Sequence, residues 1–282
     1  MMRYDATRAA LLHPEGQATL FSPGQNWSIE GVCAECSRLA YVRFETDDRN
    51  KAALTEAIAR AGLGDPAFFS DPGTGTQAYT AIDTRGSRAF VVFRGTQPDD
   101  PSDIGTNAQA VLVDWQAQGK VHLGFRDALH SVWGPISEWL LGSTGLEIWV
   151  TGHSLGAALA TLAAALLPGS RLVNFGSPRV GNDVFASQFD GRFVKRYVDC
   201  CDLVTRLPPA FLGYVHVPRM MYIDRNGKVQ PQATEALIEA DTATARREYL
   251  INESWRFGNA GVRDLADHSP VNYVSGVLQD RT

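Results

Sequence analysis

The 282-residue sequence contains no apolar run of the roughly 18 residues that a membrane-spanning helix needs. The longest candidate, Leu155–Leu167, is shorter and mostly alanine, so it predicts a buried helix. The N-terminal residues 1–10 carry Arg3, Asp5 and Arg8 without an apolar core and do not indicate a secretory signal. We therefore expect no stable membrane insertion and, by default, a cytoplasmic location, with non-classical export as the alternative.

The sequence also lacks a basic block and the short motifs of common metal and nucleotide sites. Lysine and arginine are scattered and the formal net charge is -5, so nothing indicates a nucleic-acid partner. No H-E-x-x-H, G-x-G-x-x-G or G-x-x-x-x-G-K-[ST] motif occurs, and we expect no metal and no cofactor. Hydrophobic residues make up 44% of the chain and charged residues 20%, as in ordinary soluble globular proteins.

Cysteine is scarce, with four residues in the chain. Cys33 and Cys36 lie three apart in a helical pattern, whereas Cys200 and Cys201 are adjacent and could bridge each other only with strain. A structural zinc site usually needs two separated pairs or added histidines. We expect four reduced thiols that pack as small hydrophobic side chains. A disulfide of the 33–200 type is the alternative in an exported protein.

What the sequence does contain is an alternation of apolar strand-like runs with helix-like segments. Residues 90–93 are apolar throughout, as in a strand buried on both faces, whereas Pro66 and Pro72-Gly73 predict loop. The alternation predicts one α/β domain over residues 1–282, with a mainly parallel central sheet flanked by helices on both faces. The expected helices are 30–44, 51–61, 124–141, 157–167, 184–189 and 264–278, and the expected strands are 77–83, 89–93, 146–150, 171–175, 193–198, 215–217 and 220–223.

The most informative segment is the pentapeptide Gly152-His153-Ser154-Leu155-Gly156. It follows a strand-like run and precedes an alanine-rich helix-like run, a context that predicts a nucleophile elbow with its serine on a sharp turn. The two glycines remove Cβ atoms where strand and helix crowd each other. The N–H of Leu155, at the start of the helix, would face a developing oxyanion. The alternative is a glycine-bracketed turn with an idle serine.

A serine hydroxyl needs a base to take its proton, and a histidine oriented by a carboxylate suits that task. In a strand–elbow–helix unit of this kind the acid and then the histidine follow the serine along the chain. Two histidines lie after Ser154. His216 lies in a strand-like run and is expected to be structural, whereas His268 lies at a loop-to-helix junction, a placement that suits the base.

The acid is less sharply defined by position. Asp202 follows a strand-like run, at the end of the strand where sites of parallel sheets gather. Asp199 is the other serious candidate for the catalytic acid. Position alone favours Asp202 but does not exclude Asp199. Asp224 precedes an Asn-Gly turn signal and indicates turn chemistry. Asp267 is adjacent to His268 and could hardly turn back to its imidazole.

Six motifs occur in an order that characterises a known family. Together they resemble those of the fungal-type (class 3) lipases of the α/β-hydrolase fold, and the similarity runs from about Gly31 to the end of the sequence. The motifs are Val92-Phe93-Arg94-Gly95-Thr96, Val121-His122-Leu123-Gly124-Phe125, the elbow pentapeptide, Phe175-Gly176-Ser177-Pro178-Arg179-Val180-Gly181-Asn182, Asp202-Leu203-Val204-Thr205-Arg206-Leu207-Pro208 and Asp267-His268-Ser269-Pro270-Val271-Asn272-Tyr273.

The resemblance implies that Ser154 is the nucleophile, Asp202 the acid and His268 the base, with Thr96 as the second oxyanion donor beside the Leu155 N–H. The implied activity is hydrolysis of acylglycerols or other carboxylic esters through an acyl-enzyme. A phospholipase A1 or a feruloyl-type esterase with the same residues is the near alternative, and a peptidase is a more distant one. A catalytically idle interaction protein that keeps the fold is the alternative of another class.

In class 3 lipases a short amphipathic lid follows the oxyanion motif, and the matching stretch here is 97–113. Its first half is acidic and contains proline, and its apolar residues are few. Because acidic segments are repelled by anionic membranes, we expect transient lipid-interface contact, weak interfacial activation and good activity on soluble short-to-medium acyl esters. His122, Arg179 and His153 are expected to be structural.

Overall fold

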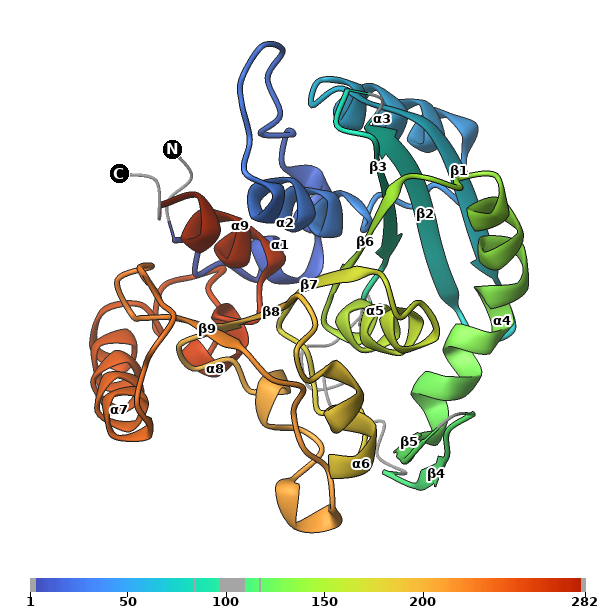
Figure 1. Ribbon diagram of the computed structural model, residues 1–282. Coiled ribbons are helices and arrows are strands. Elements are labelled where there is room, and N and C mark those ends of the chain that lie inside the picture. Colours follow the sequence, from blue (N-terminus) through green and yellow to red (C-terminus); the bar gives the residue numbers. More distant parts are fainter. Residues whose placement is uncertain (1–3, 84, 97–109, 117, 280–282) are drawn as a thin grey trace.

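The computed structural model describes residues 4–83, 85–96, 110–116 and 118–279. These residues form an eight-stranded sheet whose inner neighbours β3, β6, β7, β8 and β9 are parallel and whose outer strands are antiparallel (Figure 1). This architecture confirms the predicted α/β class. The spatial order is β1 (Leu63–Asp71), β2 (Thr76–Asp83), β3 (Arg88–Phe93), β6 (Glu147–His153), β7 (Arg171–Phe175), β8 (Val194–Asp199), β9 (Met220–Ile223) and β10 (Val229–Gln230).

Helices cover both faces of the sheet and enclose two apolar cores (Figure 1). Phe90 and Val92 of β3 belong to one core, and Val91 belongs to the other. The side chains separate in this way because successive residues of a strand point to opposite faces. The covering helices are α2 (Ile29–Leu39) and α9 (Pro270–Gln279) on the first face, and α4 (Leu123–Leu141) and α5 (Leu155–Leu166) on the second.

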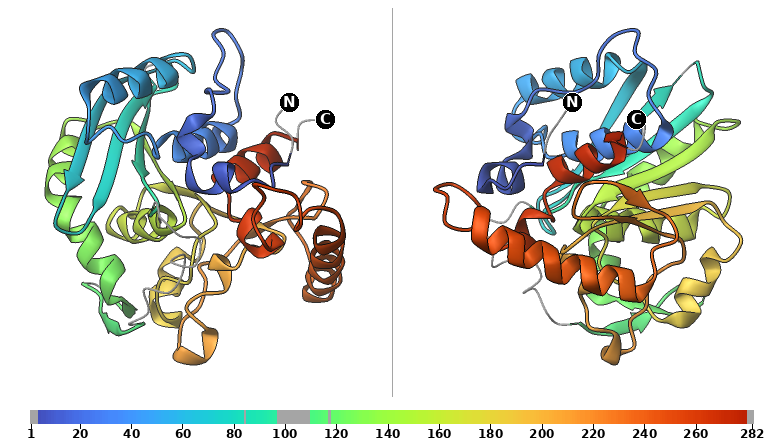
Figure 2. Two further views of the ribbon diagram at one scale, coloured as in Figure 1. Left: turned by 180° about the vertical axis from the view of Figure 1, so that it is seen from behind. Right: turned by 90° about the vertical axis from the view of Figure 1, so that its left-hand side faces the viewer.

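One long peripheral helix and several short elements complete the described chain. Helix α7 (Glu235–Asn252) lies on the outside of the fold (Figure 2) and packs through Ala245 beside β8 and β9. No helix in the described ranges is long and apolar enough to cross a bilayer. The remaining elements are α1 (Arg8–Leu12), η1 (Pro14–Gly16), α3 (Asp48–Ala59), β4 (Leu112–Asp114), β5 (Lys120–His122), α6 (Asp183–Ala186), η3 (Ser187–Phe189), η4 (Val204–Arg206), η5 (Ala210–Leu212) and α8 (Arg263–Ala266).

Two local predictions that concern strands are wrong. Pro66 does not mark a loop, because it lies within the edge strand β1, where the register with β2 shifts between Gly64 and Ala67. A proline is tolerated at such an irregularity on an edge strand, because no hydrogen bond to the neighbouring strand needs the N–H that proline lacks. The strand expected at 215–217 is reduced to an isolated bridge between Val215 and Gly181.

Candidate active site

Ser154 lies on a sharp turn between strand β6 and helix α5. Ser154 has φ 58° and ψ -127°, a conformation that is rare for a residue with a Cβ atom. A Cβ on Gly152 would overlap the carbonyl of Gly156 and lie 2.9 Å from the Phe93 carbonyl oxygen. A Cβ on Gly156 would overlap the same Phe93 carbonyl. The close approach of β3, β6 and α5 therefore requires glycine on both sides of the serine.

Three side chains from distant segments meet in a hydrogen-bonded line. His268 Nε2 lies 2.8 Å from Ser154 Oγ, and His268 Nδ1 lies 2.9 Å from both carboxylate oxygens of Asp202. All three residues are buried, with at most 8% of each exposed. Because the carboxylate accepts the Nδ1 proton, Nε2 keeps its lone pair and can accept the serine proton.

The positions of the acid and the histidine follow from where the regular elements end. Asp202 lies in the loop that follows β8, at the carboxyl end of a parallel strand. The single helix expected over 264–278 is instead two helices, α8 and α9, and His268 lies in the break between them. The break allows the imidazole to approach the elbow, which a continuous helix through this segment would not do.

Tyr273 supports the acid and was missed as a functional residue, although it ends one of the six motifs. Its hydroxyl donates to Asp202 Oδ2 at 2.6 Å and accepts a hydrogen bond from the Asp199 N–H at 3.0 Å. The Val204 N–H donates to Asp202 Oδ1 at 2.8 Å. Burial raises the pKa of Tyr273 well above its usual value, so the hydroxyl stays a donor. These bonds hold the carboxylate in the orientation that His268 requires.

The other candidate carboxylates have different partners. Asp199 accepts the Cys200 N–H at 2.9 Å, and burial raises its pKa well above the usual range, so this side chain favours the neutral form. Asp267 pairs with Arg263. Asp224 accepts backbone N–H groups of the turn that follows it, as expected. The structure brings Asp202, rather than any of these three, to His268 Nδ1.

His153 and His216 make structural contacts. His153 Nδ1 lies 2.7 Å from the Tyr41 hydroxyl, and its ring centroid lies 4.7 Å from that of His268. His216 Nε2 donates to the Thr205 carbonyl at 2.7 Å. Burial lowers the pKa of both histidines well below the usual value, so both are neutral at pH 7. His153 therefore adds an uncharged wall beside the imidazole of His268.

His122 and Arg179 also hold local structure. His122 caps the start of α4, with its Nδ1 accepting the Gly124 N–H at 3.1 Å. Burial lowers the pKa of His122. Arg179 donates to the carbonyl of Arg206 and, at 2.9 Å, to that of Pro208. The guanidinium thereby fixes the loop that runs on from the acid.

The two backbone segments expected to supply oxyanion donors lie side by side. Phe93 of β3 pairs with Gly152 of β6, so the chain that follows β3 passes beside the elbow. A Cβ on Gly95 would lie 2.7 Å from the carbonyl oxygen of the residue before Ser154, which shows how close the segments are. Thr96 follows and is exposed, and Leu155 begins α5.

Most of the lid-like segment expected at 97–113 lies outside the described residues, which resume at residue 110. Its last residues form β4, which pairs with β5 in a separate two-stranded sheet. Within this end of the segment Val111 is exposed, whereas Leu112 and Val113 are half-buried.

All four cysteines are free and buried. Cys33 and Cys36 belong to the core under α2, whereas Cys200 and Cys201 belong to the core beside α7, so the 33–200 alternative is not formed. Cys200, Cys201 and Asp267 lie close enough together to be considered as metal ligands. The hydrogen bond with Cys201 and burial raise the pKa of the Cys200 thiol, and Asp267 is already paired with an arginine. The Asp267 carboxylate that would complete the group thus already has a cationic partner.

Comparison with known proteins gives concordant matches. Residues 90–212 match the family described as lipase (class 3). A secreted mono- and diacylglycerol lipase 1 of Fusarium solani is 35% identical over 163 residues, which cover 54% of this chain and 48% of the relative. Triacylglycerol lipase OBL1 of Ricinus communis is 26% identical, with 91% of this chain and 66% of the relative covered.

Solved structures agree with the fold. The Rhizomucor miehei lipase propeptide complex superposes with a TM-score of 0.59 at 25% identity, covering 68% of this chain and 66% of that chain. A Penicillium cyclopium MDLA mutant gives a TM-score of 0.56 at 29% identity, covering 73% of this chain and 79% of that chain. The shared architecture is the α/β-hydrolase fold.

The relatives also correct one expectation. The expected cytoplasmic location is wrong, because the related lipases of Fusarium solani and Penicillium cyclopium are named as secreted proteins. Absence of a recognisable N-terminal signal was too weak an observation to assign a compartment. This chain spans about half the length of those two relatives.

Proposed function

Because residues 90–212 match the class 3 lipase family and the fold is that of the α/β-hydrolases, we propose that the chain is a member of this family and a serine carboxylester hydrolase that cleaves acylglycerols or related carboxylic esters. The proposal depends on one observation, the continuous hydrogen-bonded line from Ser154 Oγ through both nitrogens of His268 to Asp202. A surface serine and histidine would not be buried together with an oriented carboxylate.

In the proposed reaction, Ser154 Oγ attacks the ester carbonyl carbon while His268 Nε2 takes the hydroxyl proton. The tetrahedral intermediate collapses, the bond to the alkoxy oxygen breaks, and His268 returns the proton to that oxygen so that the alcohol leaves. Water then attacks the acyl-enzyme with His268 again as base. The bond between the acyl carbon and Ser154 Oγ then breaks, and the carboxylic acid product leaves. His268 returns its proton to Oγ, which restores the serine hydroxyl.

Asp202 stabilises the imidazolium that forms in both steps and holds the ring in the required tautomer. Its carboxylate is already bonded to the Tyr273 hydroxyl and the Val204 N–H, so it does not need to reorganise when the charge appears. This preorganisation is the contribution of the loop after β8 to the rate.

Thr96 and the Leu155 N–H are the proposed oxyanion donors. The support for this pair is the adjacency of the chain after β3 to the elbow and the position of Leu155 at the start of α5. The positive end of the helix dipole favours negative charge there. Loss of one such donor typically costs about 3–4 kcal/mol of transition-state stabilisation.

We propose a single catalytic domain with a lid-like segment at about 97–113 and transient contact with lipid interfaces. The acidic first half of that segment supports weak interfacial activation. The proposed binding partner is the substrate itself, a small-molecule or lipid ester.

The test is a panel of triglyceride, phospholipid, feruloyl and p-nitrophenyl esters of graded chain length, with Ser154→Ala as the control. We expect hydrolysis of acylglycerols and short-to-medium acyl esters without a sharp rate increase above substrate solubility. A preference for phospholipid or feruloyl esters would reassign the substrate. No ester hydrolysis by folded protein would contradict the activity.

A further inference from the structure

Asp267, the residue before His268, is fully buried and has four hydrogen bonds. Arg263 Nε lies 3.2 Å from its Oδ1 and 3.1 Å from its Oδ2. The Tyr4 hydroxyl donates to Oδ1 at 2.8 Å, and the Cys201 N–H donates to Oδ2 at 2.9 Å. A buried carboxylate needs such donors, because charge without partners is expensive away from water.

The bond from Cys201 to Asp267 joins the two loops of the site. Cys201 immediately precedes Asp202, and Asp267 immediately precedes His268. The backbone next to the acid is therefore fastened to the side chain next to the base. The Asp267 carboxylate thus links the loop that carries the acid to the loop that carries the base, whose side chains make the 2.9 Å contacts between His268 and Asp202.

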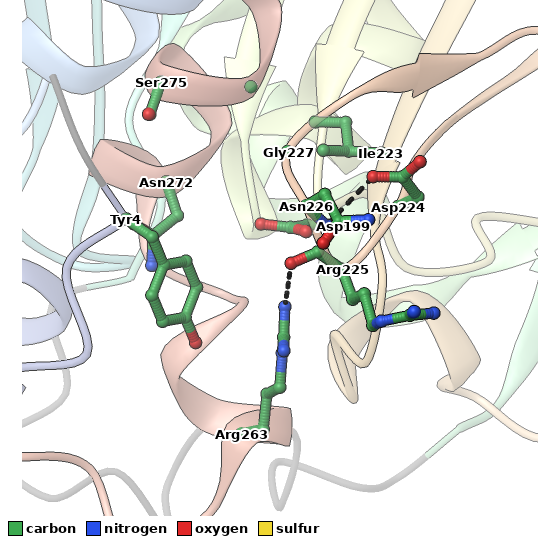
Figure 3. A pocket seen from close by; sticks show the side chains of 11 residues that line it. Tyr4, Asp199, Ile223, Asp224, Arg225, Asn226, Gly227, Arg263, Asn272 and Ser275 are labelled. Atoms are coloured by element: carbon green, nitrogen blue, oxygen red, sulfur yellow. Dashed lines mark hydrogen bonds between the residues drawn. The ribbon is translucent and has the colours of Figure 1, made fainter. Parts of the chain in front are cut away.

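Arg263 is itself fixed by several contacts. Its Nη2 donates to the Arg225 carbonyl at 3.0 Å, and its guanidinium lies 5.2 Å from the centre of the Tyr4 ring. Burial lowers the pKa of Arg263, but the neighbouring acidic groups, Asp267 foremost, together raise it above its usual value, so the guanidinium stays charged. Figure 3 shows Tyr4 and Arg263 next to each other at a cavity that Asp199 also lines.

Tyr4 belongs to an N-terminal segment that is bonded to the same region along its length. The Asp5 N–H donates to Asn272 Oδ1 at 2.8 Å, and Asn272 Nδ2 donates back to the Asp5 carbonyl at 2.9 Å. Ser269 Oγ, one residue after the histidine, donates to the Ala10 carbonyl at 2.8 Å. Residues 4–10 thus cover the loop between α8 and α9, although they lie far outside the matched range 90–212.

We propose that Tyr4, Arg263 and Asp267 are positioning residues that hold His268 in line with Ser154 and Asp202. This inference rests on the proposed function. Among the described residues, none of the three side chains is hydrogen-bonded to Ser154 or to the His268 imidazole. They act through the loop that carries the base.

The sharpest test compares Tyr4→Phe with Tyr249→Phe in the full chain. Tyr4→Phe removes only the hydroxyl that donates to Asp267. Tyr249→Phe is the matched control, because its hydroxyl bonds the carbonyls of Ala6 and Ala260 and so anchors the same segment without reaching Asp267. We expect kcat on a soluble ester to fall about tenfold for Tyr4→Phe, with KM unchanged, and to stay at the wild-type value for Tyr249→Phe.

The expected decrease in kcat follows from the sensitivity of the reaction to geometry and from the space beside Tyr4. A displacement of about 1 Å at a reacting group can cost roughly 100-fold in rate. The cavity beside Tyr4, about 90 Å³, has room for water to replace part of the lost donor, so the expected loss is smaller. Arg263→Met leaves the carboxylate without its cation and should lower kcat about 100-fold, and Arg263→Lys should recover part of that loss.

A second readout separates positioning from folding. The rate of Ser154 phosphonylation by a fluorophosphonate should fall in parallel with kcat in Tyr4→Phe, at a Tm no lower than that of Tyr249→Phe. Wild-type kcat in Tyr4→Phe, or an equal loss in Tyr249→Phe, would overturn the inference while leaving the proposed function intact. A folded wild type with neither hydrolysis nor labelling would overturn both.

Discussion

The nucleophile side and the acid–base side of this site are held by different kinds of contact. Around Ser154 the constraint is backbone shape, because Gly152 and Gly156 allow β3, β6 and α5 to approach where no Cβ fits. Around His268 and Asp202 the constraint is a set of side-chain hydrogen bonds between distant segments. One of them joins residues 263 positions apart.

The difference shows that steric fit positions the nucleophile, whereas hydrogen bonds position the acid and the base. The elbow should fail when atoms are added, because there is no space for them. The acid–base side should fail when donors are removed, because its carboxylates are buried and depend on them. Substitutions that add a methyl group or remove a hydroxyl therefore probe the two sides separately.

The largest expected effect is the loss of the nucleophile. Ser154→Ala should lower kcat by roughly 10⁶-fold, because neither side of the site can act without the attacking oxygen. The loss of a single small side chain should leave Tm close to that of the wild type. Steady-state hydrolysis of a p-nitrophenyl ester measures the first quantity, and calorimetry measures the second. Substantial residual hydrolysis would assign the chemistry to another group.

The next effect tests the elbow. Gly152→Ala should lower kcat by at least about 100-fold, because the added Cβ displaces the turn and the serine with it. It should also destabilise the fold by about 1–3 kcal/mol. The matched control is Gly134→Ala within α4, where a Cβ meets nothing within 4 Å. That variant should keep full activity, and its free energy of unfolding should change by less than about 1 kcal/mol, as measured by urea unfolding, because the helix propensity gained is offset by the proline that follows.

A smaller effect tests the acid–base side. Tyr273→Phe should lower kcat about tenfold, since it removes a hydrogen bond to a buried carboxylate. Tyr214→Phe is the control, because the buried Tyr214 hydroxyl has no hydrogen-bond partner among the described residues. Equal kinetic losses in the two variants would indicate a general packing effect and contradict the assigned role of Tyr273.

The smallest effect concerns stability and pH. The pKa of His216 lies below its unfolded value, so the unfolded state binds a proton that the folded state does not as pH falls below about 6.5. This histidine therefore decreases stability toward acid, with a slope of up to about 1.4 kcal/mol per pH unit. In His216→Gln the decline in the free energy of unfolding between pH 7 and pH 5 should be shallower. An unchanged slope would show that the histidine titrates normally in the folded protein.

The sequence predicts the nucleophile side well because its determinants are local. The glycine spacing, the apolar strand before it and the alanine-rich helix after it all lie within about twenty positions. Their physical meaning, the absence of Cβ atoms at a crossing, does not depend on the rest of the chain. The same reasoning predicted the alternation of strands and helices.

The acid–base side is less accessible to such reasoning. Position alone could not exclude Asp199, and only the fold separates its carboxylate from His268. Tyr4 gives no local signal, because its partner Asp267 is brought to it by tertiary structure. The interruption between α8 and α9, where His268 lies, could not be predicted either, because the sequence of 264–278 has a continuous helical pattern. Helix α7 was missed for a related reason, as few of its side chains are buried and its apolar pattern is weak.

The proposed mechanism requires above all that Ser154 is an activated nucleophile. The most direct measurement is reaction of the folded wild-type protein with a fluorophosphonate, followed by peptide mass spectrometry to locate the adduct. We expect one phosphonyl group on Ser154, formed fast in the wild type and slowly in His268→Ala. No adduct on Ser154 in folded protein, or an equal labelling rate without the imidazole, would contradict it.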